Sequence, residues 1–114
     1  MKTITFYRTA SGHCPVEDHL DSLTDAQVTK IAWVLKLIRE IDRVPSNYFK
    51  KLTNSDDIWE IRVDFGSNTF RLLGFYCGKD MIILTNSFQK KSQKIPKKEI
   101  ELAEKRKKEY FNRR

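Results

Sequence analysis

The chain has 114 residues, which suffices for one compact domain with its own core, and we expect a single domain over residues 1–114. Apolar residues make up 39% of it, which argues against wholesale disorder, and no run approaches the roughly 18 apolar residues of a membrane span. All of the net charge of +7 falls in residues 88–114, where 11 Lys and Arg stand against 4 Asp and Glu. Such an asymmetry indicates a polyanionic partner rather than a membrane.

The N-terminal residues predict a strand rather than a targeting segment. Residues 2–9 alternate approximately, with Ile4 and Phe6 on one face, and they lack the apolar stretch of a signal peptide. We therefore expect a cytoplasmic protein. In that compartment Cys14 and Cys77 are expected to be reduced and buried rather than paired.

Two helices are predicted next. Pro15 suits the first turn of a short helix that runs to about Leu23. Residues 24–27, Thr-Asp-Ala-Gln, have the form of a capping box that starts a second helix. Its apolar stripe includes Ile31, Leu35 and Ile38, and Pro45 favours an end just before it.

The second half of the chain predicts three strands and a last helix. After a polar loop at 46–57, residues 59–65 alternate cleanly between apolar and charged side chains, which is typical of a strand. Turns at Gly66 and Gly78 separate further strands over 69–77 and 81–84, and a basic helix is expected from about Pro96. The order β-α-α-β-β-β-α favours an α+β domain with its helices on one face of a mostly antiparallel sheet.

Several kinds of catalytic site are not indicated. The sequence has no glycine-rich phosphate loop, no serine or cysteine nucleophile motif, and no Cys/His set with the spacing of metal ligands. We therefore expect neither a metal nor another cofactor. His13 and His19 are interpreted as structural or solvated residues.

Cations on adjacent predicted strands offer a different chemistry. Arg62 lies on the polar face of its strand, Arg71 can point to the same side, and the next strand delivers Lys90 and Lys91 at its exit. Such a group could hold a phosphate and the charge that develops on it. The alternative is that Arg71 pairs across the hairpin with Glu60 or Asp64, and that the basic helix is merely a solvated face.

Three segments in register resemble one known family. They are residues 58–62 (Ile-Trp-Glu-Ile-Arg), residues 70–76 (Phe-Arg-Leu-Leu-Gly-Phe-Tyr) and residues 86–100, which contain Ser-Phe-Gln-Lys-Lys and end in Lys-Glu-Ile. Together they resemble the HigB-type, phage-derived branch of the RelE/ParE toxin superfamily, over roughly residues 48–110. The family typically shows a Trp-Glu-hydrophobic-Arg strand, an Arg-x-x-x-x-Tyr strand, and a His-x-Phe-x-Lys-Lys segment that enters the last helix.

The resemblance implies a RelE/ParE-like fold and a small toxin of a type II toxin–antitoxin pair. Many relatives are mRNA interferases that cleave mRNA on the ribosome by attack of an RNA 2′-hydroxyl on the adjacent phosphate. The implied partners are mRNA, the ribosome and an antitoxin that often carries a helix-turn-helix.

The resemblance also assigns roles to residues. Arg62 and Arg71 would hold the phosphate, while Lys90 and Lys91 would supply further charge and a lysine of lowered pKa as base or acid. The residues expected to bind substrate are Lys51, Asn86, Phe88 and Lys94. Asn86 stands where the family often has histidine, and an amide cannot carry a proton near neutral pH, so the general acid and base stay open.

Two other functions remain compatible with the sequence. One is a ParE-like poison of DNA gyrase, which shares the fold and needs no nuclease site. The other is a nucleic-acid- or protein-binding module without catalysis, because the fold alone does not decide the function.

Overall fold

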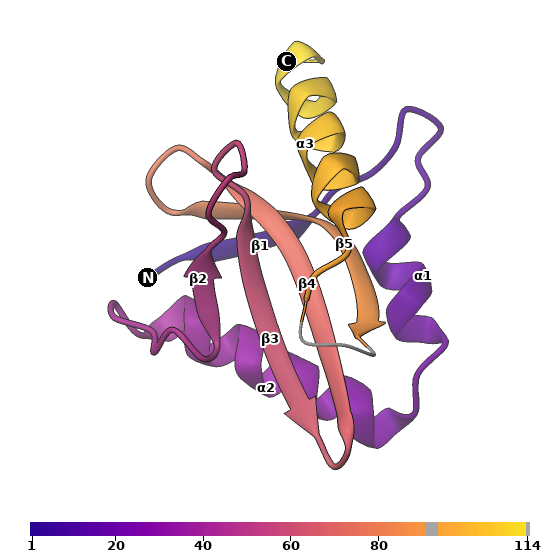
Figure 1. Cartoon of the computed structure of the whole chain (residues 1–114), viewed down its shortest axis with the longest axis vertical. Coiled ribbons are helices and arrows are strands. Elements are labelled where there is room, and N and C mark those ends of the chain that lie inside the picture. Colours follow the sequence, from indigo (N-terminus) through magenta and orange to yellow (C-terminus); the bar gives the residue numbers. More distant parts are fainter. Residues whose placement is uncertain (91–93, 114) are drawn as a thin grey trace.

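The computed structural model describes residues 1–90 and 94–113, and in that part of the chain it has an α+β fold of three helices and five strands (Figure 1). The three predicted helices and four predicted strands are all present. The elements are β1 (Thr3–Phe6), α1 (Pro15–Asp21), α2 (Asp25–Glu40), β2 (Phe49–Lys51), β3 (Trp59–Phe65), β4 (Asn68–Cys77), β5 (Met81–Lys90) and α3 (Lys97–Asn112). The first strand is shorter than predicted, and β5 continues well beyond the predicted end at residue 84.

The strands form one mixed sheet in the order β1-β5-β4-β3-β2. The pairs β2–β3, β3–β4 and β4–β5 are antiparallel, and β1 runs parallel to β5. The prediction of a mostly antiparallel sheet is therefore confirmed. The residues predicted as a loop at 46–57 include β2, a three-residue edge strand that was missed.

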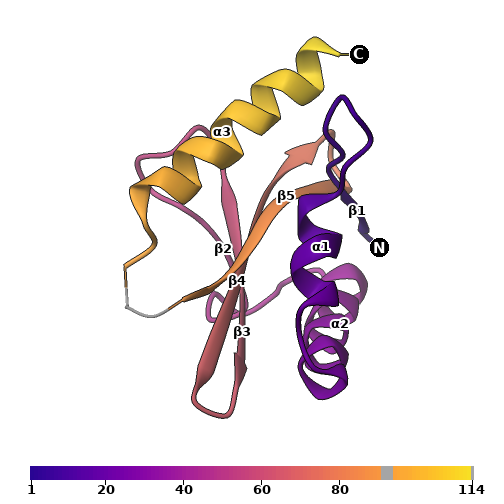
Figure 2. The same cartoon turned by 90° about the vertical axis from the view of Figure 1, so that its right-hand side faces the viewer.

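The helices cover both faces of the sheet, so the expectation that they share one face is wrong. Figure 2 shows α3 on one side of the sheet and α1 and α2 on the other. The neighbouring residues Leu72 and Leu73 of β4 are both fully buried, the first in the cluster with α2 and the second in the cluster with α3. Successive residues of a strand point to opposite faces, so a strand that is apolar on both faces needs cover on both sides.

The N-terminal helices begin as the sequence predicts. Thr24 and Gln27 form the reciprocal capping box, with backbone-to-side-chain distances of 3.0 and 3.2 Å. At the other end of α2, the Lys2 ammonium donates to the carbonyls of Ile38 and Ile41, at 3.1 and 2.7 Å. A cation at the C-terminus of a helix binds the unsatisfied carbonyls and complements the helix dipole.

A β-bulge at Thr85 determines which face the end of β5 presents. Leu84 pairs with Gly74 and Asn86 pairs with Leu73, so Thr85 has no partner on β4. Its hydroxyl donates to the Leu73 carbonyl at 3.1 Å. The extra residue moves every later side chain of β5 to the opposite face from the one that simple alternation would give. Phe88 and Lys90 consequently lie on the face that α3 partly covers.

Gly74 lets the two strands approach closely at this bulge. A Cβ atom at Gly74 would lie 2.3 Å from the carbonyl oxygen of Ile83, which is a backbone atom and cannot rotate away. We expect Gly74→Ala to lower the free energy of unfolding by about 3 kcal/mol, measured by urea denaturation. A suitable control is Gly78→Ala, where φ is +77° but no atom lies within 4 Å, and where the expected loss is about 1 kcal/mol. Equal losses in the two variants would contradict the close approach.

Candidate functional site

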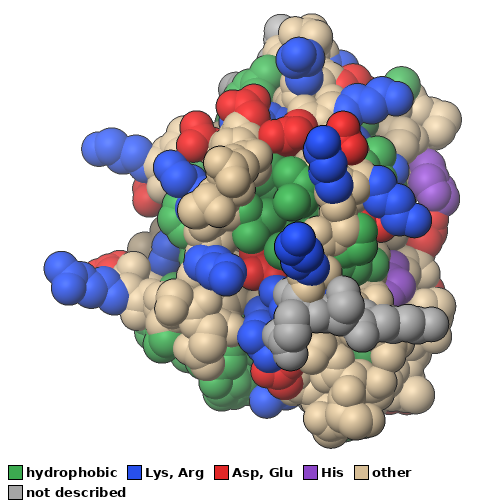
Figure 3. Space-filling model, in the orientation of Figure 1, with side chains coloured by type: hydrophobic (Ala, Val, Ile, Leu, Met, Phe, Trp, Pro, Cys, Tyr) green, Lys and Arg blue, Asp and Glu red, His purple; other side chains and the backbone are tan. Residues whose placement is uncertain are grey.

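Four cations from four strands lie on the face of the sheet that α3 partly covers, and we call them the cationic cluster: Lys50, Arg62, Arg71 and Lys90. Residues directly opposite each other in paired strands share a face. Arg62 lies opposite Arg71, and Arg71 lies opposite Phe88, two residues before Lys90. Lys50 of β2 lies opposite Glu60 of β3, two residues before Arg62. Figure 3 shows Lys and Arg side chains gathered on this face below α3.

The centre of the cationic cluster is a buried ion pair. The guanidinium of Arg71 contacts the carboxylate of Glu60, and the two residues are 5% and 2% exposed. The second carboxylate oxygen of Glu60 lies 4.0 Å from the Lys50 ammonium, whose side chain is 54% exposed. The pairing of Arg71 with Glu60, one of the two readings that the sequence left open, is therefore present. Burial lowers the pKa of Arg71.

Arg62 is the accessible arginine of the cluster. Its side chain is 37% exposed, and its Nε lies 3.3 Å from the carboxylate of Asp64, which also accepts a hydrogen bond from Thr69 at 2.8 Å. More than a third of the Arg62 side chain therefore remains open to solvent despite this contact. An exposed ion pair of this kind contributes little to stability, so Arg62 is available to an anionic ligand.

Lys90 is the least compensated charge in the cluster. The residue is 9% exposed, and its Nζ has no hydrogen-bond partner among the described residues. Burial, and then the nearby charges of Arg71, Arg62 and Lys50, lower the pKa of Lys90 to about 8. Desolvation and neighbouring cations both disfavour the ammonium form. The site thus holds an amine that can gain or lose a proton near physiological pH.

A cavity of about 290 Å³ opens beside Lys90. It lies between the end of β5 and the start of α3, and it is lined by Phe88, Gln89, Lys90, Lys94, Pro96, Lys98 and Glu99. The lining thus contains one aromatic ring, three lysines and one carboxylate, that of Glu99. A hollow with few polar groups on an apolar wall is the usual form of a small-ligand site.

The structure does not bring all of the predicted site residues together. Lys51 neighbours Lys50 on β2, so it points to the opposite face, and it pairs with Asp57 at 3.1 Å. The side chain of Asn86 is buried and donates to Glu99 of α3, so it ties the strand to the helix. Phe88 and Lys94 line the cavity. Lys91 lies outside the described residues.

Lys50 and Glu99 belong to the site but were missed by the sequence analysis. Lys50 lies in the segment predicted as a loop, where no alternation fixes a face. Glu99 was interpreted only as part of the family motif. Lys50 reaches the cluster because the edge strand β2 pairs with β3 and places Lys50 opposite Glu60, a long-range pairing that no spacing within the sequence expresses.

Neither histidine joins the cationic cluster. His13 Nε2 lies 2.7 Å from the carboxylate of Asp18, in an exposed pair. His19 Nδ1 lies 2.7 Å from the hydroxyl of Ser87, and burial lowers the pKa of His19. Cys14 is buried as expected, whereas Cys77 is only partly buried, and no three acidic, His or Cys side chains of the described residues are grouped as metal ligands.

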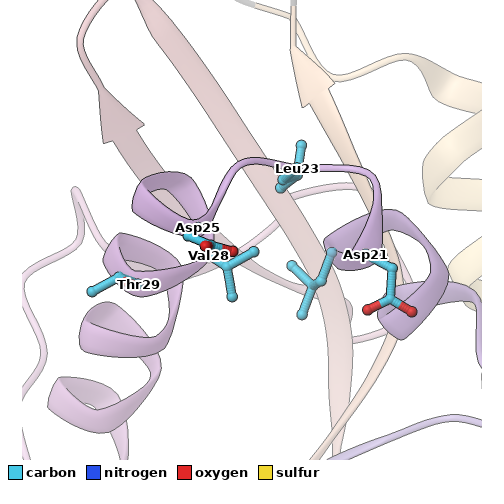
Figure 4. A pocket seen from close by; sticks show the side chains of 6 residues that line it. Asp21, Leu23, Asp25, Val28 and Thr29 are labelled. Carbon is cyan, nitrogen blue, oxygen red and sulfur yellow. The ribbon is translucent and has the colours of Figure 1, made fainter.

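A second cavity has a different character. It measures about 370 Å³ and lies where α1 meets α2, on the face away from the cationic cluster (Figure 4). Its lining consists of Leu20, Asp21, Leu23, Asp25, Val28 and Thr29. No cation is among these lining residues, so this cavity has no group that would attract a phosphate.

The fold and the site define a small α+β domain that gathers cations on one face of its sheet. Residues 18–108 match the family model described as phage derived protein Gp49-like (DUF891). The match covers most of the chain, so the chain belongs to this family, which is associated with RelE-like toxins. Among curated proteins no significant match was found. In the described part of the chain, no helix combines the length and apolar character that crossing a bilayer requires.

Proposed function

We propose that the chain is the toxin of a type II toxin–antitoxin pair and acts as an mRNA interferase, an endoribonuclease that cleaves mRNA on the ribosome. Membership of a family associated with RelE-like toxins supports the toxin assignment. The observation that carries the nuclease assignment is Lys90, a nearly buried amine beside Arg62 and Arg71 with no hydrogen-bond partner among the described residues. A buried cation without an anion is costly, and an RNA phosphate supplies the missing negative charge.

The proposed reaction is attack of an RNA 2′-hydroxyl on its own adjacent phosphorus. A bond forms between the 2′-oxygen and phosphorus as the 2′-hydroxyl gives its proton to solvent water, the bond to the 5′-oxygen breaks, and the products are a 2′,3′-cyclic phosphate and a 5′-hydroxyl. Charge builds on the non-bridging phosphate oxygens as the new bond forms. Arg62 is exposed enough to donate to those oxygens, and fixed donors aimed at developing charge lower the barrier most effectively.

Lys90 is the proposed proton donor to the leaving 5′-oxygen. With a pKa of about 8 the amine is mostly protonated at pH 7, yet it releases its proton far more readily than an ordinary lysine. Arg71 acts as a positioning residue: Glu60 holds it below the surface, and its charge helps to lower the pKa of Lys90. Lys50 and Lys94 would contact neighbouring phosphates of the same RNA.

The proposed partners follow from the same assignment. They are mRNA, the ribosome and a cognate antitoxin with a helix-turn-helix. The charge balance supports the RNA partners, because residues 88–114 carry the entire excess of cations. Family association alone supports the antitoxin.

The test is induction of the chain without a partner, followed by a cleavage assay on purified ribosomes programmed with mRNA. We expect growth and amino-acid incorporation to stop, and new 5′-hydroxyl ends to appear in the mRNA. Arg62→Ala should lower the cleavage rate by about 10²-fold, since it removes a donor to the developing charge. Lys36→Ala, an exposed cation on α2 far from the cluster, is the matched control and should cleave like the wild type.

Two outcomes would contradict the proposal. Normal growth after verified expression of folded protein would remove the toxin assignment. Arrested growth with intact mRNA and continued translation would remove the nuclease assignment and would favour the gyrase poison that the sequence left open.

A further inference from the structure

Glu99 holds a fixed carboxylate at the wall of the cavity beside Lys90. It lies in the first turn of α3, where its backbone carbonyl and its Oε1 both accept from the amide of Asn86, at 3.2 and 2.9 Å. Asn86 is itself 4% exposed and accepts from the hydroxyl of Thr85 at 2.6 Å. The carboxylate is therefore oriented by a buried network rather than free to rotate in solvent.

A base-binding site also needs a flat apolar surface, and Phe88 supplies one. Its half-buried ring lines the same cavity and precedes Lys90 by two residues on the same face of β5. Unstacked RNA bases bind by stacking on aromatic side chains while their Watson–Crick edges form hydrogen bonds. A base on Phe88 would thus lie next to the cations that are placed to hold its phosphate.

We propose that this cavity, lined by Phe88, Pro96, Lys98 and Glu99, is a nucleobase subsite, and that Glu99 makes it selective for guanine. The inference rests on the proposed function, because it takes the ligand of the neighbouring cations to be RNA. It adds a sequence preference, which the cationic cluster by itself does not define.

The selectivity follows from the donors that each base presents. A carboxylate accepts hydrogen bonds and donates none, and each oxygen can accept more than one. Guanine presents two adjacent donors, N1–H and the N2 amino group. Adenine and cytosine each place an acceptor nitrogen beside their amino group, and that nitrogen would face the carboxylate. Uracil offers one donor between two carbonyls. Only guanine therefore matches Glu99 without a repulsive contact.

The test measures binding without cleavage. The purified chain is titrated at low salt with guanosine, inosine, adenosine, cytidine and uridine 3′,5′-bisphosphates, and binding is followed by NMR chemical shifts. We expect guanosine bisphosphate to bind about 10- to 100-fold more tightly than the others, the range of a good bidentate contact. Inosine, which lacks the N2 amino group, should lose most of that advantage. The Phe88 and Glu99 amides should show the largest shifts.

Glu99→Gln sharpens the test because glutamine keeps the oxygen that accepts from Asn86. Its amide offers one donor and one acceptor, which match N1 and N6 of adenine but equally N1 and O6 of guanine, so the guanine preference should fall to a few-fold at most. Glu101→Gln, an exposed carboxylate two residues further along α3, is the matched control and should keep the guanine preference.

The outcomes separate this inference from the proposed function. Equal affinity for all five nucleotides, or an unchanged guanine preference in Glu99→Gln, overturns the subsite whether or not mRNA is cleaved. Guanine-selective binding that disappears in Glu99→Gln supports the subsite even if ribosome-bound mRNA is left intact, in which case the proposed cleavage alone fails.

Discussion

Lys90→Met is expected to lower the rate of mRNA cleavage by at least about 10²-fold while making the folded chain more stable. Methionine keeps a similar length and apolar stem but removes both the charge and the proton. Because Lys90 is nearly buried without a hydrogen-bond partner among the described residues, replacing it should raise the free energy of unfolding at pH 7 by about 1–3 kcal/mol. Ribosome-programmed cleavage and urea denaturation measure the two effects.

The gain in stability should depend on pH in a defined direction. The pKa of Lys90 is about 8 in the folded chain and 10.5 in the unfolded chain. Below pH 8 both states carry the proton, so the folded state bears the full cost of the buried charge. Between pH 8 and 10.5 only the unfolded state retains the proton on Lys90. The free energy of unfolding of the wild type therefore rises with pH in this range, and it approaches that of Lys90→Met.

Lys98→Met is the control for Lys90→Met, because Lys98 lines the same cavity but is exposed. It should change neither stability nor its pH dependence. A Lys90→Met variant that is less stable than the wild type at pH 7 would contradict the assignment of Lys90 as an uncompensated buried cation. A variant that cleaves within a few-fold of the wild type would remove Lys90 from the proposed chemistry.

Arg71→Ala is expected to destabilise the fold by about 3–5 kcal/mol, since it leaves the Glu60 carboxylate buried without its partner. This loss would hide any effect on cleavage. The double variant Glu60→Leu, Arg71→Met removes both charges and replaces them with apolar groups of similar volume, and it should recover most of the lost stability. Urea denaturation of the single and double variants measures the difference.

The double variant then separates two roles for Arg71. If Arg71 acts only by lowering the pKa of Lys90, the double variant should have a higher Lys90 pKa. The alkaline limit of cleavage should then move to higher pH, while the maximal rate changes only a few-fold. A loss of about 10²–10³ in rate at every pH would instead place Arg71 on the phosphate itself. An unchanged pH profile and an unchanged rate would leave the ion pair with a purely structural role.

Local signals in the sequence were sufficient for much of the fold. The capping box at Thr24 identified the start of α2, and the alternation of residues 59–65 identified β3, because both depend on neighbours along the chain. The edge strand β2 was missed, since three residues are too few to establish a period. The prediction that α3 shares a face with α1 and α2 was wrong. The apolar residues on both faces of β4 were a signal that helices must cover both sides of the sheet.

The candidate site was only partly predictable for the same reason. Arg62 and Arg71 could be placed together because a hairpin turn fixes their register. The face of Lys90 depends on the bulge at Thr85, and the only glycine at that bulge, Gly74, lies on the partner strand, so nothing within residues 81–90 marks the change of phase. Glu99 reaches the cavity only through the packing of α3 on the sheet, a long-range contact that no spacing within the sequence expresses.

The parallel pairing of β1 with β5 also orders events during synthesis of the chain. β1 leaves the ribosome well before β5, the strand that is its neighbour in the sheet. Until β5 and α3 emerge, β4 has an open edge and an uncovered apolar face, which are the features that lead incomplete chains to aggregate. A message cut before residue 81 would therefore yield fragments that lack β5 and α3, and we expect these fragments to be insoluble and to lack the cationic cluster.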